Sequence, residues 1–191
     1  MRRSLLIRQV VPFLFWYALL ILAAIGVDGL LHRAGLYWIG RYLGIVGSVL
    51  IVSSFAYSLR KRKIIKRGSP KILLELHEYM SWAGALMILI HAGVHFNAVL
   101  PWAAVAVMLI AVASGFTGKY LLKNARERLR TREAGLREAG LKDEEVADRL
   151  FLDATTIDMM KRWRAVHIPI TTVFGTLAVL HVLSILIFWR W

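Results

Sequence analysis

The sequence predicts an all-α integral membrane bundle of five transmembrane helices, with a cytoplasmic N-terminus and a C-terminus on the outer face. Three observations lead to this fold class. The 191 residues are 58% hydrophobic with a mean hydropathy of +0.58, well above a soluble domain of this length. Long windows contain no Asp, Glu, Lys or Arg. The basic residues gather in alternating connections.

The charge-free windows define the expected helices. They are Val10–Val27, Tyr42–Leu59, Tyr79–Gly118 and His167–Trp189. About 20 apolar residues cross a bilayer core as a helix. The third window is twice that length and contains Pro101 near its middle, so it predicts two crossings joined by a tight turn. The expected helices are Val10–Leu31, Leu36–Leu59, Lys71–Asn97, Trp102 to beyond Gly118, and Val166–Trp189. The first lacks a cleavage pattern, so we expect it to be retained.

The distribution of Lys and Arg predicts the orientation of these helices. Three precede the first helix, seven lie in the connection after the second, and twelve lie between Lys119 and Arg164, which together make 22 of the 25. The other connections hold only Arg33, Arg41 and Arg190. By the positive-inside rule this predicts a multi-pass protein of the cytoplasmic membrane. The positive charge is then explained by topology and anionic lipid, so no nucleic-acid partner is expected.

The chain is interpreted as one domain, 1–191, with one sizeable charged connection at 119–164. That connection holds 12 basic and nine acidic residues, with apolar residues at helical spacing. We expect two or three short helices on the cytoplasmic surface, with breaks at Gly135 and Gly140. Two interpretations stay open: a docking surface for a partner, and a connector bound to lipid.

Four of the six histidines occur in two pairs with the same spacing. His77 and His91 lie fourteen positions apart in the third expected helix, and His167 and His181 repeat this in the fifth. Fourteen helical residues return to within about 40° of the same face and span about 21 Å. Because both helices run outward, we expect His77 to oppose His167 near the cytoplasm. His91 then opposes His181 near the outer face.

Opposed histidines on two helices predict a redox cofactor. Two imidazoles can bind one haem iron axially, so two pairs predict two non-covalent b haems. The chain has no cysteine, which excludes covalent haem attachment and iron–sulfur ligation. A metal-ion or proton pathway is the alternative for buried histidines. It is weakened because Asp28, Glu75 and Glu78 lie near helix ends instead of deep in the membrane.

Two midpoint residues fit the same arrangement. Gly84 lies seven positions from both His77 and His91, and Phe174 lies seven from both His167 and His181. We expect Gly84 to face Phe174 between the two haem planes. Pro169 complicates the inner pair, because a helix that started there would leave His167 outside the helical phase.

Several further residues are candidates for contacts around the haems. Haem propionates favour basic or indole partners. Candidates at the inner haem are Lys71, Arg162 and Arg164. Candidates at the outer haem are Arg41, Trp38 and Trp102. His95 and Asn97 are a possible quinone or acceptor site. No specific role is expected for His32.

The paired histidines on the third and fifth helices, with an inside N-terminus, resemble the transmembrane core of the ferric reductase and NADPH oxidase family. The spacing also resembles that of the respiratory cytochrome b family. The resemblance implies that His77, His91, His167 and His181 are the axial ligands of two b haems. The ferric reductase core commonly adds a sixth helix and a flavin/nicotinamide domain, whereas this chain carries no GxGxxG element.

The function that the resemblance implies is transmembrane electron transfer, as the membrane subunit of a reductase-type complex. Its electrons would come from a separate cytoplasmic flavoprotein or iron–sulfur protein. One alternative is a quinone-reactive cytochrome that exchanges electrons with the quinone pool near the outer haem. A third interpretation is a haem-free metal or proton transporter.

Overall fold

The described part of the chain is mostly helical. The computed structural model describes residues 2–93, 98–116, 122–151 and 163–188, and no strand occurs among them. Its helices are α1 (Arg2–Arg33), α2 (Tyr37–Ser54), α3 (Ala56–Lys61), α4 (Pro70–Ala92), α5 (Val99–Phe116), α6 (Leu122–Glu138) and α8 (Trp163–Phe188). Residues 143–151 form a further short helical segment.

Four helices are long and apolar enough to cross a membrane. These spans are Val11–Arg33, Tyr37–Lys61, Pro70–Ala92 and Ala165–Phe188, judged by length and composition. The second span combines α2 and α3. The apolar part of α5, Val99–Gly115, is shorter. An all-helical multi-pass membrane protein is therefore what the structure supports.

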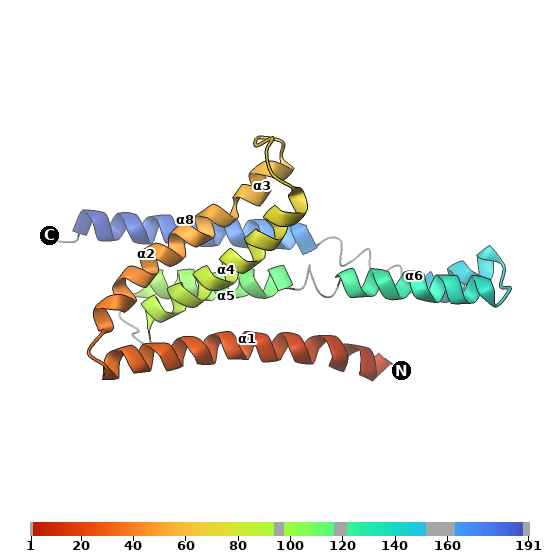
Figure 1. Ribbon diagram of the computed structural model, residues 1–191, viewed down its shortest axis with the longest axis horizontal. Coiled ribbons are helices and arrows are strands. Elements are labelled where there is room, and N and C mark those ends of the chain that lie inside the picture. The colour runs from red at the N-terminus through yellow and green to blue at the C-terminus, as the bar shows by residue number, and fades with distance from the viewer. Residues whose placement is uncertain (1, 94–97, 117–121, 152–162, 189–191) are drawn as a thin grey trace.

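The long helices alternate in direction along the chain. In Figure 1, α1, α4 and α8 run one way and α2 and α5 run back, so α4 and α8 are parallel. The N-terminus, α3 and α6 lie toward one end of the molecule, and the C-terminus lies at the other. Within the bundle α4 is central, because it packs against α1, α2, α3 and α5, whereas α8 packs chiefly against α5.

The second and third helices end differently from the expectation. The second helix breaks at Phe55 and resumes as α3 instead of running unbroken to Leu59. The third ends at Ala92 because Gly93 takes a φ of 57°, a left-handed conformation that glycine adopts without strain. Asn97 and the expected continuation of the fourth helix just past Gly118 lie outside the described residues.

The charged connection contains the short helices that were expected, but only one of the two expected breaks. Gly135 lies inside α6, whereas Gly140 has a φ of 80° and follows the end of that helix. Arg137 links the two sides of the turn, 3.2 Å from Glu133 and 3.5 Å from Asp143. Figure 1 shows residues 143–151 folding back beside α6, away from the main bundle.

A small apolar core joins the central helices. Ala85 of α4, Met108 of α5 and Phe174 of α8 are buried together. One hydrogen bond crosses between α1 and α5, from the Tyr17 hydroxyl to the Leu109 carbonyl at 3.0 Å. Few side chains are buried, and most of the large apolar side chains lie on the outer surface of the bundle. Such a surface is the kind that lipid tails can cover.

Candidate functional site

The contact between α2 and α4 is built on glycine. A Cβ added to Gly47 would lie 2.9 Å from the Gly84 carbonyl oxygen, and one added to Gly84 would lie 2.8 Å from the Gly47 oxygen. These two backbones therefore approach as closely as only glycine permits, a common mode of helix association in membranes. One turn earlier in α2, a Cβ at Gly44 would lie 2.6 Å from the His91 ring. The missing side chain at Gly44 is what makes room for that imidazole.

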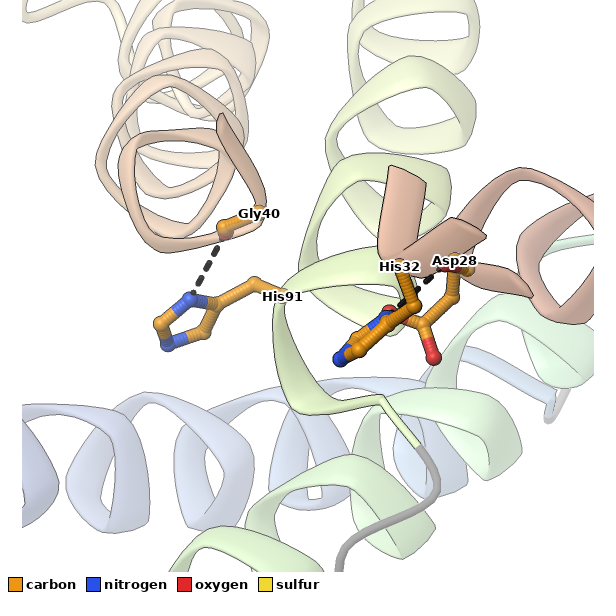
Figure 2. A network of polar contacts seen from close by, with 4 residues as sticks. All are labelled: Asp28, His32, Gly40 and His91. Carbon is orange, nitrogen blue, oxygen red and sulfur yellow. Dashed lines mark hydrogen bonds and ion pairs between the residues drawn. The ribbon is translucent and has the colours of Figure 1, made fainter. Parts of the chain in front are cut away.

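The α4 histidines are both anchored to the α2 backbone. Nδ1 of His91 lies 3.1 Å from the Gly40 carbonyl oxygen, and Nδ1 of His77 lies 3.1 Å from that of Ser54. A carbonyl oxygen can only accept, so Nδ1 carries the hydrogen in both rings. In a neutral imidazole this leaves Nε2 with its lone pair free for a metal. Figure 2 shows the second ring nitrogen of His91 directed away from Gly40, toward the side where α8 passes.

The His77 ring has two further supports. Its ring centroid lies 5.9 Å from that of Tyr57 in α3, with the planes inclined at 31°. Ser54, whose carbonyl binds the ring, is itself buried and receives a hydrogen bond from the Ser81 hydroxyl at 3.3 Å. The helix break after Ser54 therefore places both the Ser54 carbonyl and the Tyr57 ring against the His77 imidazole.

His167 is held by α5 in a comparable way. Its Nδ1 lies 2.6 Å from the Ser114 hydroxyl oxygen, and that hydroxyl donates its only hydrogen to the Ala111 carbonyl at 3.0 Å. While its own hydrogen goes to Ala111, the hydroxyl accepts from the ring, so Nδ1 again carries the hydrogen. A Cβ at Gly115 would lie 3.7 Å from Cε1 of this ring.

Pro169 does not take His167 out of the helix. α8 begins at Trp163 and contains Pro169 in its interior. His167, Phe174 and His181 therefore share one continuous helical phase. A proline inside a membrane helix frees a backbone carbonyl, which neighbouring groups can satisfy.

The four histidines form two pairs between α4 and α8. His77 lies near enough to His167 for an electrostatic interaction, and His91 lies near enough to His181. Yet α4 and α8 do not pack closely on one another in the described chain, since each has a different main neighbour. His91 is exposed and the other three are half-buried.

The expected midpoint pair is arranged differently. Gly84 is directed toward α2, where Gly47 and Ile51 lie closest to it. Phe174 instead packs in the small core with Ala85 and Met108. The reason is that the tight α2–α4 contact uses the space left by Gly84, so the phenylalanine lies beside the neighbouring alanine. Phe174 still occupies the level between the two histidine pairs.

The remaining candidate residues are scattered. Lys71 is exposed in the first turn of α4, Arg41 is exposed in α2, and Arg164 lies in the first turn of α8. Trp38 is exposed and contacts the Tyr42 ring edge-on at 6.2 Å. Trp102 lines a pocket against α1. Arg162, His95 and Asn97 lie outside the described residues.

Sequence reasoning did not identify the groups that orient the histidines. Ser114, the Gly40 carbonyl and the Ser54 carbonyl belong to other helices, at sequence separations of 23 to 53 residues from their histidines. The small residues of "GIVG" at 44–47 indicate close helix packing, but not which ring would lie against them. In the described ranges no three His, Asp or Glu side chains converge to hold a metal ion.

No protein-family model, curated protein or solved structure matches this chain.

Proposed function

We propose that this protein is a membrane cytochrome that carries electrons across the cytoplasmic membrane with two b haems, held by His77 with His167 and by His91 with His181. The observation that carries the proposal is the two facing histidine pairs on parallel helices, with Nδ1 of three rings occupied by a hydrogen bond. Such a bond fixes the tautomer and aims Nε2 at a metal, as is usual for metal-binding histidines. The haem itself supplies one-electron redox chemistry when bound.

The residues around the pairs fit an iron porphyrin in three ways. Neutral imidazole is a common axial ligand of haem iron. α4 and α8 carry the opposed ligands but each packs chiefly on another helix, which favours a flat group between them at the histidine levels. Small residues lie beside the rings, with Gly44 next to His91 and Gly115 next to His167.

The arrangement also supports passage across the membrane. Fourteen residues separate the histidines on each helix, which corresponds to about 21 Å along the axis. We propose α5 as a fifth crossing, because its 18 residues extend about 27 Å and carry no charge. The basic residues at the end that holds the N-terminus, α3 and α6 favour a cytoplasmic location for that end.

The electron donor that we propose is a separate cytoplasmic flavoprotein or iron–sulfur protein. The chain has no cysteine for a cluster of its own. The projecting pair formed by α6 and residues 143–151 lies toward the end where α4 and α8 begin, so it offers a surface on the side of His77 and His167. The protein would then be the membrane subunit of a reductase-type complex.

The test is a reduced-minus-oxidised absorption spectrum of the purified protein, made in cells supplied with haem. We expect a b-type signal and two haems per chain. His91→Ala should lower the ratio to about one, while His32→Ala, another histidine of the same end, should leave two. Absence of a b-type signal would overturn the proposal. An unchanged ratio in His91→Ala would overturn the pairing.

A further inference from the structure

A pocket of about 150 Å³ lies between α1, α4 and α5, apart from the facing histidine pairs. Its walls are almost entirely apolar. Ala24 belongs to α1 and Leu89 to α4, Gly93 is the residue directly after α4, and Trp102 and Val105 belong to α5. The exception is Asp28 of α1, which lines the pocket and is only 6% exposed. An ionisable side chain placed in a membrane helix is expensive and is by default a sign of function.

Among the described residues Asp28 contacts His32, and this partner reaches the surface. Its Oδ1 lies 3.3 Å from Nδ1 of His32, one turn further along α1, and the same nitrogen lies 2.9 Å from the Asp28 carbonyl oxygen. The His32 side chain is 47% exposed. Figure 2 shows the other carboxylate oxygen of Asp28 pointing away from the His32 ring. One oxygen is therefore bound by the protein and the other is directed elsewhere.

The size and chemistry of the pocket limit its ligand. A cavity of about 150 Å³ with apolar walls accommodates one benzene-sized ring. A carboxylate oxygen beside apolar walls favours a hydrogen-bond donor. The His32 ring already contacts Asp28 and the other lining residues are apolar, so a neutral donor fits better than a cation. Trp102 supplies an aromatic wall on which a ring can stack.

We infer that this pocket binds a neutral, membrane-soluble aromatic ring with a hydroxyl group that donates to the Asp28 carboxylate. The binding does not depend on the haems. Gly93 and Leu89 flank His91 in the sequence, so the ring lies near the outer histidine pair. Two sources share this chemistry: a hydroquinone of the membrane pool, and a simple phenol.

The test measures binding by calorimetry to the full chain in lipid nanodiscs. The probes are decylhydroquinone, 4-decylphenol and decylbenzene, the last of which has no hydroxyl. We expect the hydroxylated probes to bind one per chain, and decylbenzene at least tenfold more weakly. Equal binding of the first two indicates a general phenol site, and binding of decylhydroquinone alone indicates the membrane pool. Equal binding of decylbenzene, or no binding of any probe, would overturn the inference.

Variants locate the site. Asp28→Leu should weaken the binding of decylhydroquinone at least tenfold, and Asp28→Asn several-fold, because an amide oxygen is a weaker acceptor than a carboxylate. Ala24→Leu should fill the pocket and abolish binding, whereas Ala23→Leu, one position away and outside the pocket lining, should not. The Ala24 and Ala23 variants decide the matter even if Asp28→Leu fails to fold. Unchanged affinity in Ala24→Leu would place the probe elsewhere. Haem content, measured separately, tests the proposed function alone.

Discussion

At the scale of single residues, the hydrogen on Nδ1 decides which nitrogen of a histidine can bind a metal. Three rings have that hydrogen engaged, two by backbone carbonyls and one by Ser114. Groups that orient a ligand in this way commonly change metal affinity by 10- to 100-fold when they are removed. The orienting residues therefore make sharper tests than the ligands, because the ligand itself stays in place.

Ser114→Ala should weaken haem retention at the inner pair by about tenfold, because the His167 ring loses the acceptor of its Nδ1 hydrogen. Ser114→Thr keeps the hydroxyl and should restore retention. Thr176→Ala, on the exposed side of α8, removes a hydroxyl bonded only within its own helix and serves as the control. The measurement is haem loss to apomyoglobin over time. Equal rates in Ser114→Ala and wild type would contradict the role of this serine.

Gly44→Ala should displace the His91 ring, because the added Cβ would lie 2.6 Å from it. We expect the Nδ1 bond to Gly40, worth about 0.5–1.5 kcal/mol, to break, and the outer haem to bind several-fold more weakly. Gly26→Ala adds a methyl group where nothing lies within 4 Å and should leave haem content unchanged. Haem titration by absorbance distinguishes the two. Retention of full affinity in Gly44→Ala would mean that the ring can move freely.

The spacing of the four histidines can be read from the sequence, but the residues that hydrogen-bond to them cannot. A fourteen-residue spacing is a local property of one helix, so His77 and His91 could be placed on one face directly. Ser114 carries no comparable signal. Its role depends on the rotation of α5 against α8, which is set by packing between segments distant in the chain. The same argument applies to Gly84, because the sequence does not show that α2 packs against it.

At the scale of elements, the pair α2–α4 depends on small residues. The Gly47 and Gly84 backbones are in direct contact, with Ile51 and Ile88 packed at the sides. Without a hydrophobic driving force between membrane helices, close van der Waals contact of this kind holds them together. Glycine also sets a helix boundary. The positive φ of Gly93 ends α4 earlier than the apolar pattern of the sequence predicts.

Gly47→Leu should separate α2 from α4 and lower the thermal unfolding midpoint. Forcing a large side chain into a packed interface commonly costs about 1–3 kcal/mol, and more where backbone is the obstacle. Gly29→Leu makes the same change on α1, where an added Cβ meets nothing within 4 Å, and should have little effect. Circular dichroism melting in detergent gives both midpoints. Equal midpoints would mean that α2 and α4 are not held by this contact.

At the scale of the whole molecule, alternation of the helices places the connections at two ends. The absence of native cysteine makes each introduced cysteine a unique label. Exposed sites are available on both sides, with Ala34 and Ala98 at one end and Ser69 and Ala139 at the other.

A membrane-impermeant maleimide should therefore label Ala34→Cys and Ala98→Cys in intact cells. Ser69→Cys and Ala139→Cys should react only after the cells are opened. The physical reason is the excess of Lys and Arg at the second end, which retains it in the cytoplasm. Gel-shift of the labelled protein is the measurement. Labelling of Ala139→Cys in intact cells would reverse the orientation.

The two closest helix pairs divide the histidines evenly. His77 and His91 belong to α4, which is joined to α2, whereas His167 and His181 belong to α8, which is joined to α5. Any group bound by one histidine from each side acts as a non-covalent cross-link between two halves of the molecule. Its binding free energy then adds to the folding free energy, by RT ln(1 + [L]/Kd). The supply of that group in the cell would set how much of the protein survives proteolysis, so cofactor loading would act as quality control during assembly.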